Sequence, residues 1–182
     1  MGERVGLDRE TTEPRDIRVL ALDVDGVLTS GAIFLDGERE LKQFNVQDGL
    51  GLQLAQRGGI KVFFVTSRPG PVVEQRASEL GVDGLRMVEK GKLAALTALA
   101  EQAGVGLAQV AYVGDDLVDL PPMMACGLPI AVANAVDEVK RAAAYITERK
   151  GGKGAVREAV EWLLREAGAW DEVLEGYLAD QS

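Results

Sequence analysis

The 182-residue sequence contains no histidine and only one cysteine, Cys126. Without histidine the chain lacks the residues for a Ser-His-Asp or Cys-His hydrolase site, and for a metal site made of imidazole ligands. A single cysteine excludes an intramolecular disulfide and fits a reducing compartment such as the cytoplasm. Cys126 is interpreted as a small buried apolar residue.

Aromatic residues and long apolar runs are also scarce, and the 20 basic residues are outnumbered by 29 acidic ones. Aromatics make up 5% of the chain, so a core must consist mainly of Val, Leu, Ile and Ala. No stretch approaches the roughly 18 apolar residues of a transmembrane helix, and residues 1–16 lack the apolar run of a signal peptide. The net charge of −9 and the pI of about 4.6 disfavour nucleic acids and anionic membranes as partners.

Short apolar runs alternate with stretches of helical character along the chain. This alternation predicts an α/β fold with a Rossmann-like, doubly wound, mostly parallel sheet covered on both faces. Asp36-Gly37 lies between two extended stretches and predicts a small β-hairpin flap. We expect a disordered leader at residues 1–16, one domain at 17–168 and a tail helix at 169–182. The predicted strands cover 17–24, 60–66, 84–88, 110–113, 128–132 and 145–147, and the predicted helices cover 49–56, 71–80, 92–103, 117–125, 136–144, 155–167 and 170–177.

The first predicted strand is followed by Asp23-Val24-Asp25-Gly26. Two carboxylates next to a buried strand are costly unless they are paired or bind a cation. An aspartate can attack phosphorus to form an aspartyl-phosphate, and a second carboxylate nearby can protonate the leaving oxygen. Gly26 permits the tight turn that directs both side chains into one cavity.

Further polar residues follow the other strands. Thr66 ends the second strand and offers a hydroxyl, and Lys92 begins a helix and offers a positive charge for a phosphoryl group. The predicted strand at 110–113 is followed by Gly-Asp-Asp-Leu-Val-Asp, with Asp115, Asp116 and Asp119. Three carboxylates in five residues favour a hard cation such as Mg²⁺.

The order of these motifs resembles the haloacid dehalogenase superfamily of phosphatases. The stretches DVDGVLTSG, KQFNVQDGLG, AYVGDDLVDLP and GGKGAVRE narrow the resemblance to its capless branch acting on 3-deoxy-D-manno-octulosonate 8-phosphate. It extends from about Ile17 to Gly168 and implies no cap domain. The chain departs from the usual pattern at Ser67, where glycine is common, and at Ser30, where aspartate is often found.

The resemblance implies a role for each matching residue. Asp23 would be the nucleophile and Asp25 the acid/base, with Thr66 and Lys92 holding the phosphoryl group. Mg²⁺ would be held by Asp23, the carbonyl of Asp25 and Asp115, with Asp116 and Asp119 nearby. The expected substrate contacts are Asp25, Val46, Gln47, Asp48, Gly49, Ser67, Arg68, Arg76, Arg86 and Lys92. Arg76 has an equal alternative as an exposed helix residue, and Gly151–Gly154 with Arg157 either approach a site or cap the last long helix.

The expected substrate is a small phosphorylated sugar acid, and the implied setting is cytoplasmic lipopolysaccharide biosynthesis. The resemblance also implies a homotetramer in which a neighbour's hairpin helps to close the site. Independently, the apolar residues Ile33, Phe34 and Leu35 of the hairpin favour packing against another subunit. Three alternatives stay open: a phosphatase of a related nonulosonate phosphate, a signalling receiver domain, and a non-catalytic assembly module.

Overall fold

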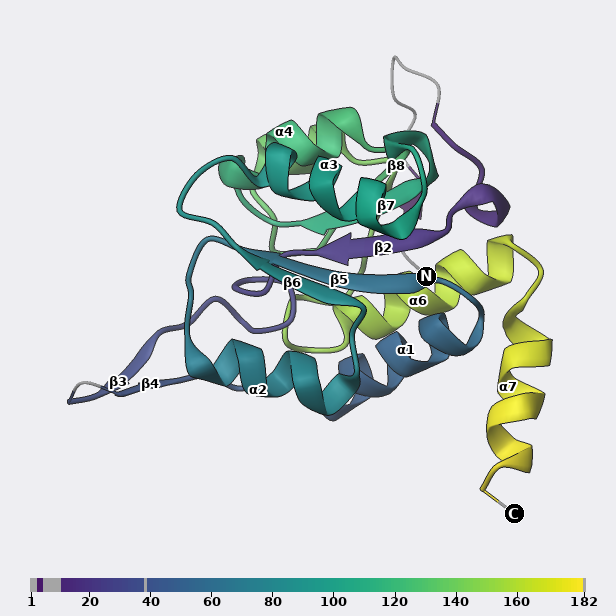
Figure 1. Cartoon of the computed structure of the whole chain (residues 1–182), viewed down its shortest axis with the longest axis horizontal. Coiled ribbons are helices and arrows are strands. Elements are labelled where there is room, and N and C mark those ends of the chain that lie inside the picture. The colour runs from purple at the N-terminus through teal and green to yellow at the C-terminus, as the bar shows by residue number, and fades with distance from the viewer. Residues whose placement is uncertain (1–2, 5–10, 38, 182) are drawn as a thin grey trace.

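A central sheet organises the computed structural model, which describes residues 3–4, 11–37 and 39–181 (Figure 1). Its seven strands lie in the order β1-β9-β8-β7-β2-β5-β6, and β1 alone runs antiparallel to its neighbour. The doubly wound, mostly parallel sheet predicted from the sequence is thereby confirmed. The strands are β1 (Glu3–Arg4), β2 (Val19–Leu22), β5 (Lys61–Thr66), β6 (Gly84–Met87), β7 (Val110–Gly114), β8 (Leu128–Ala131) and β9 (Tyr145–Ile146).

The central strands are apolar because helices cover both of their faces. All four residues of β2 are buried, and the strand pairs with β5 on one side and β7 on the other. A continuous run of branched apolar residues is typical of a parallel strand buried on both faces. The first apolar run therefore forms the middle of the sheet, and the residues that follow it emerge at the centre of one edge.

Helices form one layer on each side of the sheet (Figure 1). The helices α1, α2 and α6 lie on one side, where α1 packs against both of the others, and α3, α4 and α5 lie on the other. The α-helices are α1 (Val46–Arg57), α2 (Pro71–Leu80), α3 (Lys92–Ala103), α4 (Leu120–Ala125), α5 (Asp137–Ala142), α6 (Ala155–Glu166) and α7 (Trp170–Ala179), and the 3-10 turns are η1 (Pro14–Asp16), η2 (Leu107–Gln109) and η3 (Leu117–Asp119).

Two helices differ from the prediction for local reasons. The helix α1 begins at Val46 rather than Gly49, because the Asn45 side chain caps it by accepting the amide of Gln47 at 2.8 Å. The single helix predicted at 117–125 is divided into η3 and α4. Asp116 and Asp119 form a reciprocal cap on η3, and prolines occupy the start of α4.

The predicted hairpin is present as β3 (Phe34–Asp36) and β4 (Arg39–Leu41), and Gly37 in its turn has a φ of 60°. It projects away from the two helical layers (Figure 1), and Leu35 is 73% exposed. The expected disordered leader includes residues 11–16, of which Pro14–Asp16 form η1 with Pro14 buried. Residues 1–2 and 5–10 lie outside the described ranges. No helix in those ranges is long and apolar enough to cross a membrane.

The strand order places a topological switch point beside β2. From β2 the chain passes to β5 and β6 on one side, and then returns to β7, β8 and β9 on the other. In open α/β sheets of this kind, ligands bind beyond the carboxyl ends of the strands at the point where the order reverses. The ends of β2 and β7, with the acidic motifs that follow them, lie at this point.

Candidate active site

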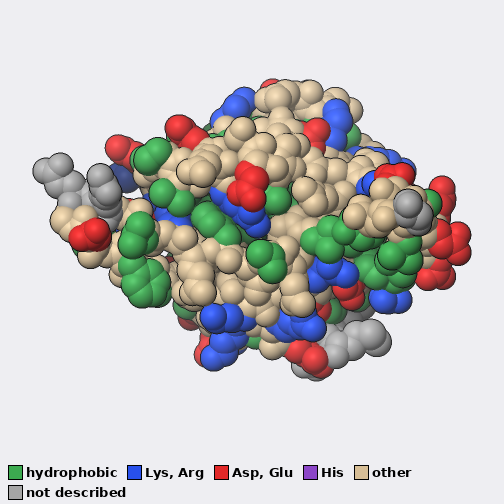
Figure 2. Space-filling view, turned by 90° about the horizontal axis from the view of Figure 1, so that it is seen from below, with side chains coloured by type: hydrophobic (Ala, Val, Ile, Leu, Met, Phe, Trp, Pro, Cys, Tyr) green, Lys and Arg blue, Asp and Glu red, His purple; other side chains and the backbone are tan. Residues whose placement is uncertain are grey.

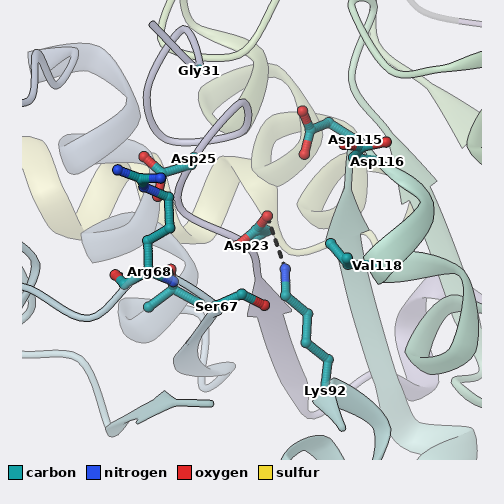
Figure 3. Close-up of a pocket in the computed structure, with 10 residues that line it drawn as sticks. Asp23, Asp25, Gly31, Ser67, Arg68, Lys92, Asp115, Asp116 and Val118 are labelled. Atoms are coloured by element: carbon teal, nitrogen blue, oxygen red, sulfur yellow. Dashed lines mark hydrogen bonds and ion pairs between the residues drawn. The ribbon is translucent and has the colours of Figure 1, made fainter. Parts of the chain in front are cut away.

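A cavity of about 260 Å³ opens at the switch point (Figure 3). Asp23 follows β2, Thr66 ends β5 and Asp115 follows β7, so three neighbouring strands each contribute a polar side chain. Lys92 reaches the same cavity from the start of α3. The remaining lining residues are Asp25, Gly31, Ser67, Arg68, Asp116 and Val118.

Asp23 is held at the bottom of the cavity. Its side chain is buried, and Oδ1 accepts the amide of Val24 at 2.7 Å. The Nζ of Lys92, whose residue is 4% exposed, lies 2.9 Å from Oδ2 of Asp23 (Figure 3). One oxygen of Asp23 is therefore held by a backbone amide, and the other faces the buried ammonium group of Lys92.

The turn after Asp23 requires glycine. Gly26 has a φ of 92°, and a Cβ at this position would lie 1.9 Å from Oδ2 of Asp115. The Thr29 hydroxyl supports the turn by accepting the amide of Gly31 at 3.2 Å. The close approach of the two acidic loops therefore depends on the absence of a side chain at Gly26.

Asp119 anchors the acidic loop after β7. It is fully buried, and its Oδ1 accepts bonds from Lys92 Nζ and from the Tyr112 hydroxyl, both at 2.8 Å. Its Oδ2 accepts the amides of Asp115 at 3.0 Å and Asp116 at 3.3 Å. With both oxygens occupied, Asp119 positions Lys92 and Asp115 in this structure.

The carboxylates at this point form a candidate cation site. Within the described ranges, one oxygen each of Asp23, Asp115 and Asp119 lie within 4.8 Å of one another. Among the residues that the structure describes, Oδ1 of Asp115 is buried and has no hydrogen-bond partner, and the same is true of Oδ2 of Asp25. The unpartnered buried oxygen of Asp115 and an all-oxygen donor set fit a hard divalent cation.

Burial and mutual repulsion disfavour the charged forms of these carboxylates. Burial, followed by the charge of Asp119, raises the pKa of Asp23 to about 7, although the ammonium group of Lys92 opposes this shift. Burial, followed by the charges of Asp119 and Asp23, raises the pKa of Asp115 to about 8. A cation bound between these groups would stabilise their ionised forms.

Asp116, expected among the metal ligands, lies at the rim of the cavity. It is exposed, and its Oδ1 accepts the amide of Leu117 at 2.7 Å as the cap of η3. Its sequence neighbours Asp115 and Asp119 face inward instead. The three aspartates of the motif therefore occupy three different environments.

Some expected substrate contacts make internal bonds. The buried Asp48 accepts the amides of Gly154 at 3.2 Å and Arg157 at 2.8 Å, and so joins α1 to the start of α6. Burial raises the pKa of Asp48 while these backbone bonds lower it. Arg86 donates to Gln102 at 2.9 Å at the outer strand of the sheet.

Arg76 is not an exposed helix residue, because its side chain is 13% exposed and pairs with Glu79 at 2.9 Å, and its role as a substrate contact stays a prediction. It lies 5.5 Å from the centre of the Phe44 ring and beside Gly49, and its Nε is buried without a partner. Val46 is 82% exposed at the start of α1, next to Gln47. These residues do not line the cavity within the described chain, whereas Ser67 and Arg68 do.

The glycine-rich segment 151–154 supports the loop after β2, which carries Asp23 and Asp25. The amide of Gly152 donates to the carbonyl of Val27 at 2.9 Å, and a Cβ on Gly151 would lie 1.7 Å from the carbonyl oxygen of Gly26. Asn134 links the two loops, since it accepts the Gly151 amide at 2.6 Å and donates to the Gly26 carbonyl at 3.0 Å. The segment thus lies against the loop after β2 within this chain, and whether it contributes to binding stays a prediction.

Arg157 points elsewhere, because its Nε bonds to Glu161 at 2.5 Å and its guanidinium lies over Trp170.

The sequence analysis missed Lys42. Its side chain is 4% exposed, and its Nζ lies 2.5 Å from Oδ1 of Asp25 and 2.8 Å from Oε1 of Glu40. The only sequence signal is its place in the stretch KQFNVQDGLG, because neither strand periodicity nor a metal-ligand pattern distinguishes this lysine.

Comparisons with known proteins agree with this geometry. Residues 87–159 match the family of haloacid dehalogenase-like hydrolases. The 3-deoxy-D-manno-octulosonate 8-phosphate phosphatase of Salmonella typhi is 44% identical over 163 residues, which cover 88% of this chain and 86% of that protein.

Two solved structures of such phosphatases have the same fold. The Moraxella catarrhalis protein, in complex with a magnesium ion, a phosphate ion and a KDO molecule, has a TM-score of 0.87 and 38% identity, covering 91% of this chain and 95% of that one. The cobalt-bound Haemophilus influenzae protein has a TM-score of 0.85 and 38% identity, covering 87% of this chain and 94% of that one. The similarity thus extends over nearly the whole chain.

Proposed function

Because this chain belongs to the 3-deoxy-D-manno-octulosonate 8-phosphate phosphatases of the haloacid dehalogenase superfamily, and is thus a hydrolase of phosphate monoesters, we propose that it hydrolyses that sugar phosphate through an aspartyl-phosphate at Asp23. The observation that carries the proposal is the meeting of Asp23, Asp25, Lys92 and Asp115 in one cavity at the switch point. We place the reaction in cytoplasmic lipopolysaccharide biosynthesis.

The residues divide the reaction into two displacements. In the first, a carboxylate oxygen of Asp23 attacks phosphorus, the ester P–O bond breaks, and Asp25 gives its proton to the leaving sugar oxygen. In the second, Asp25 takes a proton from water, whose oxygen attacks phosphorus and displaces Asp23 to release inorganic phosphate. Lys92 and Thr66 hold phosphoryl oxygens, and the positive charge of Lys92 opposes the negative charge of the transferring group.

The carboxylates of Asp23 and Asp115 and the backbone carbonyl of Asp25 would hold Mg²⁺, with Asp116 at the rim. When bound, this ion neutralises carboxylate charge and polarises phosphate oxygens. The unpartnered Oδ1 of Asp115 supports this assignment. Asp119 keeps the hydrogen bonds that it accepts from Lys92 and Tyr112, and it positions the loop that carries Asp115.

Recognition of the sugar acid begins at Ser67 and Arg68, which line the cavity on the side of β5. Arg68 is half exposed and supplies a positive charge for an anionic substrate near the cavity mouth. Ser67 lies beside the position proposed for the phosphoryl group and can donate a hydrogen bond to it.

We also propose a homotetramer in which the hairpin contacts another subunit. Ile33, Phe34, Leu35 and Leu41 are each more than half exposed, and Figure 2 shows apolar side chains gathered at the hairpin end of the molecule. An isolated two-stranded ribbon with this much exposed apolar surface is not expected to be stable alone. Replacing Phe34 and Leu35 by serine should produce smaller oligomers in light scattering, whereas an unchanged tetramer would contradict this part of the proposal.

The activity is tested by phosphate release from a panel of sugar phosphates that includes 3-deoxy-D-manno-octulosonate 8-phosphate and a nonulosonate phosphate. Asp23→Asn should reduce kcat by more than about 10³-fold and abolish acid-stable labelling by ³²P-substrate, because the amide is a poor nucleophile. The exposed residue Asp137 provides the matched control Asp137→Asn, which should retain activity. Labelling that persists in Asp23→Asn would exclude an aspartyl-phosphate at Asp23. A higher kcat/KM for the nonulosonate phosphate would make that sugar phosphate the substrate instead.

A further inference from the structure

Lys42 contacts the proposed acid/base and has no role in the reaction described above. It directly follows β4 of the hairpin, yet its side chain turns back into the body of the protein and is 4% exposed. Its Nζ lies 2.5 Å from Oδ1 of Asp25. A lysine is seldom buried to this extent unless it is paired, and here its partner is a carboxylate of the site.

The two oxygens of Asp25 have different surroundings. Oδ1 receives the ammonium group of Lys42, whereas Oδ2 is buried and has no hydrogen-bond partner within the described chain. Proton transfer to a leaving oxygen requires one free carboxylate oxygen at a defined position. The bond from Lys42 restrains rotation of the carboxylate and leaves Oδ2 as the oxygen free to carry the proton.

Glu40 extends this contact into a chain of alternating charges. Its Oε1 lies 2.8 Å from Lys42 Nζ, and its Oε2 lies 3.0 Å from Nη2 of Arg68. The hydrogen bond from Lys42 is the main reason that the pKa of Glu40 is lowered, so Glu40 stays ionised in this pair. This chain of charges thus connects three segments: the loop after β2 that carries Asp25, the hairpin that carries Glu40, and the loop after β5 that carries Arg68.

We propose that Lys42 is a positioning residue that holds the Asp25 carboxylate so that Oδ2 exchanges the proton with the leaving oxygen and then with water. Lys42 itself neither gives nor takes a proton in these steps. The inference rests on the proposed function, since it requires Asp25 to be the acid/base. It also makes the hairpin part of the catalytic apparatus, because the hairpin strand carries Glu40 and leads directly into Lys42.

The test compares two leaving groups in a set of variants. A sugar alkoxide requires protonation as it leaves, whereas p-nitrophenolate hardly does, so damage to the acid should affect the sugar phosphate selectively. Lys42→Met should lower kcat for the sugar phosphate by about 30-fold or more and kcat for p-nitrophenyl phosphate by less than about 5-fold. The first loss is a part of the roughly 10²–10⁴-fold that general acid catalysis contributes as a whole, because Asp25 itself is still present. KM should change little, and Lys42→Arg should restore most of the lost kcat. Lys61→Met is the matched control, because Lys61 is exposed at the opposite end of β5.

The double variant Asp25→Asn/Lys42→Met separates this inference from the proposed function. If Lys42 acts through Asp25, adding Lys42→Met to Asp25→Asn should cause less than about 2-fold further loss. Equal losses on both substrates, or a raised KM with unchanged kcat, would overturn the positioning role and indicate a structural or substrate-binding lysine. If Asp25→Asn itself shows no leaving-group dependence, the proposed acid fails, and the inference about Lys42 fails with it.

Discussion

Magnesium should stabilise this protein against heat, and the stabilisation should grow as the pH rises. The reason lies in Asp23 and Asp115, whose pKa values are raised to about 7 and about 8 in the folded protein. An unfolded aspartate has a pKa near 3.9. The folded, metal-free protein therefore binds protons more tightly than the unfolded chain between about pH 4 and pH 8, and its stability falls as the pH rises through this window.

The expected magnitude follows from the size of these shifts. One pKa unit corresponds to about 1.4 kcal/mol, so each of the two raised pKa values lowers the stability of the metal-free protein by on the order of 5 kcal/mol at pH 8. Mg²⁺ at about 100 times its dissociation constant would stabilise the folded state by about 2.7 kcal/mol. For a chain of this length that corresponds to a rise in Tm of about 5–10 °C.

Differential scanning calorimetry in EDTA and in MgCl₂ at pH 5.5, 7.0 and 8.5 measures both effects. The magnesium-induced rise should be small at pH 5.5, where protons compete for the ligands, and largest at pH 8.5. Asp115→Asn should abolish most of it, while the exposed control Asp137→Asn should leave it unchanged. A rise that is equal at pH 5.5 and 8.5, or that survives Asp115→Asn, would refute both the ligand assignment and the origin of the pKa shifts.

Two substitutions test the packing behind the cavity. Gly26→Ala should lower the free energy of unfolding by more than about 2 kcal/mol and abolish activity, because the φ of Gly26 is 92° and the new Cβ would lie 1.9 Å from Asp115. Urea denaturation measures the loss of stability, and Gly106→Ala is the control because a Cβ there meets no neighbouring atom. Tyr112→Phe should lower the free energy of unfolding by about 2 kcal/mol, or Tm by about 4–8 °C, because it removes a buried hydroxyl donor 2.8 Å from Asp119. An unchanged Tm would show that this hydrogen bond does not stabilise the protein.

The sequence by itself determined the sheet, the hairpin and the acidic motifs. Those features are local: an apolar run as short as Val19–Leu22 between charged residues is typical of a buried strand, and Asp36-Gly37 has the residues that a tight turn requires. The sequence likewise places Asp23 and Asp115 at the ends of predicted strands, but only the structure shows that these two strands are neighbours. The helix start at Val46 was missed because the cap by Asn45 is weaker in the sequence than the run of leucines that follows it.

Only the tertiary structure decided what each polar residue touches. Asp48 turns to the backbone of α6, more than 100 residues away in the sequence, and Asp119 rather than Asp116 is the buried carboxylate that holds Lys92. Such contacts arise when distant segments are packed together, and a buried polar group must find its partner there because burial without one costs free energy. For the same reason no local pattern could show that Lys42 reaches the carboxylate of the proposed acid/base.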